Sequence, residues 1–290
     1  MGEPAPVESL RLGVIRASGP DVDQFLRAQL SNDVLRLGPD RHFLAAWCDA
    51  KGRTQLVLRV AMSDDAYLLL LPRELLDAAL QKLRMFVLRL KVELTDVSAD
   101  YQIVGVHDDD RIPPVDRTEQ RAGQIWLGLP GSQPHPARAL VLTRGAAEPP
   151  APSMPADSAD WAMSEIDAGL AQVTAATQNE FVPQMLNLHW LMAVDFDKGC
   201  YPGQEVIARL QHRGRLTRRV FRLAWQGRRP TPGEPVHTAD KTVGQVLLAA
   251  GENEGRLLAV VQVDAAAAEA LHIDDGQTLE LLELPYPTPA

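Results

Sequence analysis

Cysteines, long apolar runs and glycine-rich phosphate loops are scarce or missing in this 290-residue sequence. Its two cysteines, Cys48 and Cys200, form no CxxC pair, so we expect neither a disulfide framework nor a protein-only metal site. No apolar run approaches the roughly 20 residues that span a bilayer, and residues 1–7 lack a basic start and an apolar signal core. The sequence therefore predicts a cytoplasmic protein without membrane association. The glycines form neither GxGxxG nor GxxxxGK[ST], so no common nucleotide-binding loop is expected.

Acidic residues are missing from one stretch of a chain that is acidic overall, with a formal net charge of −9. Val206 to Gly233 contains no Asp or Glu, yet its arginines are Arg209, Arg213, Arg215, Arg218, Arg219, Arg222, Arg228 and Arg229. This segment, Arg209–Arg229, is expected to form an electropositive rim that binds an acidic partner, the tRNA backbone or another anion. The same charges could instead protect a solvated strand edge. The sequence leaves both interpretations open.

Strand-like and helix-like patterns alternate in the first half of the chain, which predicts an α+β fold of mixed sheets and helices. Helical spacing follows Pro20 and Pro72, which are expected in the first turns of two helices. The expected strands are Leu10–Ala17, His42–Cys48, Thr54–Met62, Ala66–Leu71 and Lys91–Asp96, the second and third forming a hairpin.

The last quarter of the chain has a different pattern. Short strand-like runs with turn residues between them predict a small β-barrel, at Val220–Trp225, Val243–Ala249, Leu257–Val263 and Leu279–Leu284. Residues 145–160 are rich in Ala, Pro and Ser and are expected to form an irregular surface connector within the large domain. The predicted domains are thus residues 1–214 and residues 215–290.

The segment KGCYPGQE, residues 198–205, is the most informative motif in the chain. It gathers a thiol, a cation, a phenol, an amide and a carboxylate around two glycines, in Lys198, Gly199, Cys200, Tyr201, Gly203, Gln204 and Glu205. Pro202-Gly203 favours a turn, so the sulfur of Cys200 is expected to be exposed on a loop. Lys198 and Arg209 lie near enough in sequence to stabilise a thiolate. The alternative for an isolated cysteine is a small apolar filler.

This motif, with Asn187 and the run FVPQ at residues 181–184, resembles the signature of the YgfZ family. The N-terminal half is also similar, from Gly19 through the segment FLRAQL at residues 25–30 to Asn32 and Asp33, and then in CDAKGR at residues 48–53. The resemblance implies the fold of the glycine cleavage T-protein, with a large folate-binding domain and a C-terminal barrel. It also implies a role in the assembly or repair of iron-sulfur clusters.

The resemblance further implies a cofactor, tetrahydrofolate or a one-carbon derivative, and residues that hold it. Trp161 would stack on the pterin, and Asp167, where relatives have Glu-Ala-Gly, would accept its paired N–H donors. Asn187, Asn32, Asp33, Gly199 and Gly203 would lie beside the same cavity. Without the family, Trp161 could equally be a core aromatic, and Asn32 and Asp33 could simply cap or turn the chain.

Two classes of function follow. The first is a folate-binding accessory protein for iron-sulfur client enzymes, including those that modify tRNA, in which Cys200 contacts a cluster, a sulfur species or a partner thiol. The second is a folate-dependent one-carbon enzyme, an aminomethyltransferase or demethylase. Arg53–Ser63 contains no carboxylate where T-protein-like enzymes place one, which favours the first class. His189 and His212 complete no recognisable catalytic triad, so whether the chain is an enzyme stays open.

Overall fold

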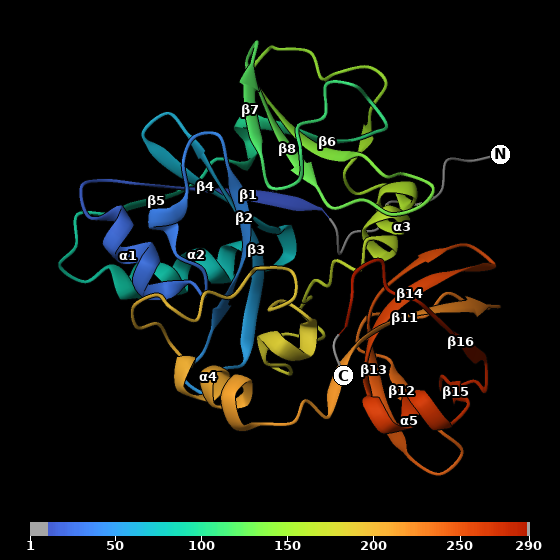
Figure 1. The fold of residues 1–290 in the computed structure, drawn as a ribbon. Helices are drawn as coiled ribbons and strands as arrows, with labels where there is room; N and C mark the ends of the chain where they lie inside the picture. Colours follow the sequence, from blue (N-terminus) through green and yellow to red (C-terminus); the bar gives the residue numbers. More distant parts are fainter. Residues whose placement is uncertain (1–10, 289–290) are drawn as a thin grey trace.

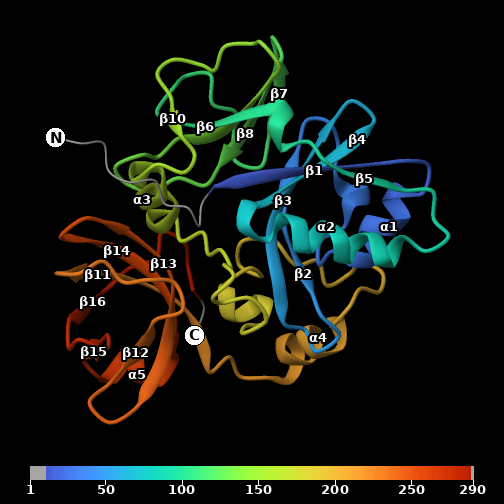
Figure 2. The same cartoon turned by 180° about the vertical axis from the view of Figure 1, so that it is seen from behind.

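The computed structural model describes residues 11–288, which form two five-stranded sheets followed by a closed barrel (Figure 1). The helix α3 lies between the second sheet and the barrel, and α4 lies beside the turn of the β2–β3 hairpin (Figures 1 and 2). The α+β class and the C-terminal barrel expected from the sequence are confirmed.

The first sheet has the strand order β2-β3-β4-β1-β5. Its strands are β1 (Leu12–Ser18), β2 (His42–Cys48), β3 (Thr54–Ser63), β4 (Ala66–Pro72) and β5 (Glu93–Asp96). The helices α1 (Val22–Gln29) and α2 (Arg73–Val87) bury their apolar stripes in its core. The expected β2–β3 hairpin is confirmed, with Ala45 opposite Leu58. Pro20 and Pro72 lie just before their helices, not within the first turns, because Asp21 and Pro72 occupy the N-cap positions.

The second sheet has the order β10-β6-β9-β8-β7. Its side chains share an apolar cluster with side chains of the first sheet. Its strands are β6 (Tyr101–His107), β7 (Thr118–Arg121), β8 (Gln124–Leu129), β9 (Arg138–Arg144) and β10 (Met154–Pro155). The connector at residues 145–160 is therefore not wholly irregular, because β10 pairs with β6 and α3 (Ala159–Asp167) begins inside it. Proline tolerates this edge position, where its missing N–H is not needed.

The barrel closes in the order β11-β14-β13-β12-β15-β16. Its elements are β11 (Arg218–Gln226), β12 (Pro235–His237), β13 (Thr242–Gly251), β14 (Glu254–Gln262), α5 (Val263–Ala268), β15 (Leu271–His272) and β16 (Thr278–Leu282). One core cluster contains both barrel residues, such as Leu247 and Val260, and residues of the first sheet. The domain division at residue 215 remains a prediction, because the two parts share a core.

Three 3-10 helices and one longer helix complete the described chain. They are η2 (Val34–Arg36), η3 (Ser98–Asp100), η4 (Pro183–Leu186) and α4 (Gln204–Arg213). The helix α4 buries only Ile207 of its side chains, and the side-chain amide of Gln184 donates to the Ile207 carbonyl at 2.7 Å. A largely exposed helix thus carries the residues that follow the cysteine motif.

Candidate functional site

The thiol of Cys200 is exposed, as the turn signal Pro202-Gly203 indicated. The other cysteine, Cys48, lies in the core with 1% of its surface exposed, and burial raises the pKa of its thiol to about 12. The two cysteines therefore differ in both access and ionisation. At neutral pH the thiol of Cys48 is protonated and enclosed.

Gly203 anchors the cysteine motif to the β2–β3 turn. Its backbone has φ +80°, and a Cβ atom there would lie 2.4 Å from Cα of Gly52 and 2.5 Å from the carbonyl oxygen of Asp49. Both the left-handed conformation and the close approach require glycine. Gly199 differs, because a Cβ atom there would meet nothing closer than the Arg27 guanidinium at 3.8 Å. The left-handed turn is thus found at Gly203, and a place for Gly199 beside a ligand remains a prediction.

The side chain of Lys198 contacts the end of α1, and its expected effect on the Cys200 thiol remains a prediction. Its ammonium group donates to the carbonyls of Arg27 and Leu30 and lies 4.8 Å from the centre of the Tyr201 ring. Burial lowers the pKa of Lys198 to about 8, although the nearby carboxylates of Asp33 and Asp195 act to raise it. Lys198 therefore holds the loop against the C-terminal end of α1, where backbone carbonyls favour a cation.

The remaining motif residues shape the entry into α4. The backbone N–H of Tyr201 donates to the side-chain oxygen of Gln204 at 3.2 Å, while the Tyr201 ring is buried beside Cys48. Burial raises the pKa of the Tyr201 hydroxyl. Glu205 is exposed in the first turn of α4, where a negative charge complements the helix dipole, and Arg209 is exposed one turn further on.

Asn32 and Asp33 are fully engaged in local structure. The Asn32 amide donates to the carbonyls of Leu44 and Met192 at 3.0 and 2.8 Å, and so ties β2 to the loop before the cysteine motif. Asp33 caps η2 by accepting from the Leu35 N–H at 3.1 Å, and it pairs with Arg27 at 3.2 Å. The capping interpretation thus holds for Asp33, whereas Asn32 joins two distant segments, and the role of both residues beside a ligand remains a prediction.

Trp161 on α3 packs in the core with residues of the second sheet, and 2% of its surface is exposed. The His107 ring stacks on it at 5.2 Å, the Arg138 guanidinium lies 4.6 Å from its centre, and Gly105 packs so closely that a Cβ atom would stand 2.0 Å from the indole. These neighbours leave little of the indole exposed. The structure therefore agrees with the interpretation of Trp161 as a core aromatic residue. Stacking of Trp161 on folate remains a prediction.

The carboxylate of Asp167 is bound by two arginines of the barrel. Arg256 on β14 donates to Oδ2, and Arg222 on β11 lies 3.4 Å from Oδ1, with the Asp167 side chain 5% exposed. Both oxygens thus have charged donors within the protein. This pairing joins α3 to the barrel, and direct contact between Asp167 and a pterin remains a prediction.

Asn187 lies at the junction between the large domain and the C-terminal segment. It has φ +59° and is completely buried, and its amide donates to the Val220 carbonyl at 3.2 Å and contacts the Tyr286 hydroxyl at 3.3 Å. The Tyr286 hydroxyl donates in turn to the Gly169 carbonyl at 2.9 Å. Asn187 therefore places Tyr286 against the large domain.

Two adjoining hollows lie between the two sheets, α3 and the C-terminal segment. They share Leu44, Arg59 and Leu170 in their walls. The first also includes Trp161 and Glu165, while the second, about 660 Å³ including space open to solvent, is lined further by Asp116, Trp190, Leu191, Met192 and Tyr286. Apolar walls with a few polar groups are typical of small-molecule sites. We name this pair of hollows the central cavity.

The sequence did not single out the cavity residues Arg59, Asp116 and Trp190, but it did name His189, the neighbour of Trp190. His189 packs on Trp190 with ring centres 4.5 Å apart, and burial lowers the pKa of His189 to about 4. The cavity contains none of the KGCYPGQE residues in its walls. The expected site residues therefore fall into two groups, one around the exposed Cys200 loop and one at the junction with the barrel.

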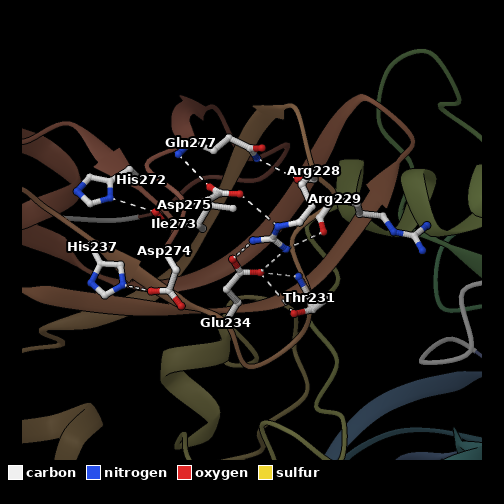
Figure 3. A network of polar contacts seen from close by, with 10 residues as sticks. All are labelled: Arg228, Arg229, Thr231, Glu234, His237, His272, Ile273, Asp274, Asp275 and Gln277. Atoms are coloured by element: carbon white, nitrogen blue, oxygen red, sulfur yellow. Dashed lines mark hydrogen bonds and ion pairs between the residues drawn. The ribbon is translucent and has the colours of Figure 1, made fainter.

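Three arginines of the arginine-rich segment pair with carboxylates, and the expected electropositive rim remains a prediction. Arg222 is paired with Asp167 and Arg215 with Asp264, while Arg228 belongs to a separate network in the barrel (Figure 3). In that network Arg228 contacts both Glu234 and Asp275, and Gln277 donates to the Arg228 carbonyl at 3.1 Å. Within residues 11–288, the other arginines of this segment form no ion pair with a carboxylate. They are Arg209, Arg213, Arg218, Arg219 and Arg229.

Two further observations concern metals and membranes. Among residues 11–288, no three His, Cys, Asp or Glu side chains gather in a way that could hold a metal ion. In the same part of the chain, none of the helices has the length and apolarity required to span a bilayer.

Comparisons with known proteins place this architecture. The structure superimposes on the glycine cleavage system aminomethyltransferase T from Bartonella henselae with a TM-score of 0.70, covering 96% of this chain and 85% of that one at 11% sequence identity. The fold is thus that of the T-protein class, and residues 217–284 match the CAF17 C-terminal β-barrel domain. A tRNA-modifying protein YgfZ from Cronobacter sakazakii is 30% identical over 93% of this chain and 89% of its own length. The chain belongs to the YgfZ family.

Proposed function

We propose that the protein binds a reduced folate, tetrahydrofolate or a one-carbon derivative, in the central cavity. In this proposal it supports iron-sulfur enzymes, among them enzymes that modify tRNA, as an accessory protein. The observation that carries the proposal is the composition of the cavity wall. Leucines and the aromatic residues Trp190 and Tyr286 provide flat apolar surface, and Arg59, Asp116 and Glu165 provide polar groups of both charges.

These residues suit the chemistry of a folate. A pterin ring presents apolar faces, which aromatic side chains contact well, and N–H donors along one edge, which a carboxylate accepts. Asp116 is the better candidate for this acceptor, because the Glu165 carboxylate is already bound by Arg138. Burial raises the pKa of Asp116, while Arg59 and Arg41 act to lower it. When bound, the folate would supply a carrier for a one-carbon unit.

The exposed Cys200 loop supplies the second half of the proposal. A thiol that projects into solvent can reach a cluster, a sulfur species or a thiol of a partner protein, and Cys200 is not among the residues that line the central cavity. Exposed basic residues in α4 and at the start of β11 lie close to Cys200 in sequence and favour an acidic partner or tRNA. They are Arg209, Arg213 and Arg218.

A direct binding experiment tests the folate proposal. Tetrahydrofolate should raise the melting temperature and change the tryptophan fluorescence, because Trp190 lines the cavity and a ligand bound only by the native state stabilises it. Trp190→Leu should lose most of the fluorescence change but melt near the wild-type temperature. If millimolar tetrahydrofolate changes neither signal in the wild type, the proposal fails.

A further inference from the structure

Arg59 is a buried cation without a carboxylate partner. Only 6% of its surface is exposed, and none of the ion pairs within residues 11–288 includes it. Glu165 and Asp116 are close enough to act on its charge, but the Glu165 carboxylate is bound by Arg138 and Asp116 forms no hydrogen bond with Arg59 among the described residues. Burying an arginine in this way costs free energy unless its charge is paired or hydrogen-bonded.

The geometry of the sheet points Arg59 into the central cavity. In the register of β2, β3 and β4, Arg59 lies opposite both Leu44 and Leu70, and these leucines also line the cavity. Arg59 itself contributes to both hollows. A guanidinium group has five N–H donors, and one of them bonds to the protein in this region, to Nδ1 of His42 at 3.1 Å. The other donors are thus available to a ligand.

His42 fixes the orientation of this guanidinium. Nε2 of His42 lies 2.9 Å from the Gly128 carbonyl on β8, so it carries the proton and Nδ1 is left as an acceptor for Arg59. Burial, with help from the Arg59 charge, holds the pKa of His42 well below its usual range, so the ring stays neutral. The two hydrogen bonds therefore link Gly128 in the second sheet through His42 to Arg59 in the first sheet, at the wall of the cavity.

We propose that Arg59 is the anchor for an oxygen acceptor of the cavity ligand, and that His42 is a positioning residue that aims the guanidinium. This inference rests on the proposed folate function and names the polar contact within it. A folate offers two acceptors of the required kind, the ring carbonyl of the pterin and the carboxylates of the glutamate tail. A planar guanidinium binds either through two parallel hydrogen bonds.

The test compares wild type with Arg59→Met in the full chain, using tetrahydrofolate as the probe. Arg59→Met should bind about 10- to 100-fold more weakly, because charge-assisted hydrogen bonds are lost. Without ligand the variant should melt at or above the wild-type temperature, because an unpaired buried charge has been removed. A residue with only a structural role would show the reverse pattern, a lower melting temperature with unchanged affinity, and that result would overturn the inference.

Two fragments of folate and a second variant identify which contact Arg59 makes. Tetrahydropterin tests the ring carbonyl and p-aminobenzoylglutamate tests the carboxylates, and the fragment whose affinity depends on Arg59 identifies the acceptor. His42→Leu should weaken tetrahydrofolate binding, and the double variant should bind no worse than Arg59→Met alone, because His42 acts only through Arg59. Additive losses would contradict the positioning role. If the wild type itself fails to bind, the folate proposal falls, whereas equal binding by wild type and Arg59→Met removes this inference alone.

Discussion

Gly203 of the cysteine motif packs directly on Gly52 of the β2–β3 turn, although the two residues are far apart in sequence. The Cβ position of Gly203 is 2.4 Å from Cα of Gly52, and both residues have positive φ. The two segments that carry the family resemblance, CDAKGR and KGCYPGQE, therefore form a single structural unit. This contact holds the start of α4, shortly after Cys200, against the β2–β3 turn.

Gly203→Ala should destabilise the protein by about 1–3 kcal/mol, because it adds a methyl group against backbone atoms at a left-handed φ. Urea unfolding measures the loss. Gly199→Ala is the matched control in the same motif and should change stability by less than about 0.5 kcal/mol, since its Cβ would make only ordinary contact with the Arg27 guanidinium at 3.8 Å. Similar losses for both variants would mean that the packing of Gly203 is not the cause.

Cys200 and Cys48 should differ sharply in alkylation. Iodoacetamide at neutral pH should modify the exposed Cys200 and spare the buried, protonated Cys48 until the protein is unfolded. Mass spectrometry of the native and unfolded protein reads out both positions. Native-state modification of Cys48 at a comparable rate would contradict the described burial.

Loss of the Cys200 sulfur should affect function and spare the fold. Cys200→Ser should melt like the wild type, because an exposed side chain contributes little packing, and should fail to support iron-sulfur enzyme activity in cells that lack the endogenous protein. Cys48→Ala serves as the control for the loss of a thiol elsewhere. Full complementation by Cys200→Ser would assign the motif to loop structure alone.

The buried ammonium group of Lys198 should make the free energy of unfolding depend on pH above about 8. Its pKa is about 8 in the folded protein and near 10.5 in the unfolded chain, so between these values the unfolded state binds more protons. Stability should therefore rise as pH increases from 8 towards 10.5, and this contribution should be constant below pH 8. Comparing urea unfolding of wild type and Lys198→Met at pH 7.5 and pH 10 isolates the effect, and an equal pH dependence in both proteins would exclude it.

Asp167→Asn should destabilise the protein by about 2 kcal/mol, because Arg222 and Arg256 lose their shared counter-charge at the barrel interface. Asp160→Asn, on the same helix but exposed, is the control. Tetrahydrofolate titration of both variants separates the two roles of Asp167. Unchanged affinity assigns it to the arginines, and a large loss of affinity in a folded variant supports the expected contact with the pterin.

Local sequence patterns identified the features that depend on near neighbours. The β2–β3 hairpin, the four long barrel strands and the exposed Cys200 follow from period-two alternation and turn chemistry, which are encoded within a few residues. No strand was expected from the sequence between residues 101 and 144, where β6, β7, β8 and β9 lie. A short apolar run predicts a strand, but it does not reveal the partner with which that strand pairs.

The tertiary structure alone decided which charges meet and which remain free. Asp167 precedes Ala-Gly as in the family motif, yet its partners Arg222 and Arg256 come from two barrel strands that the sequence could not align with α3. Arg59 reads as one charged residue within an apolar strand, and its place in the cavity depends on the register of three strands and on His42 and Gly128. Sequence by itself determined the local turns, the periodic faces and the exposed motif. Pairings between distant segments arose only on folding, because they depend on how two sheets, a helix and a barrel pack together.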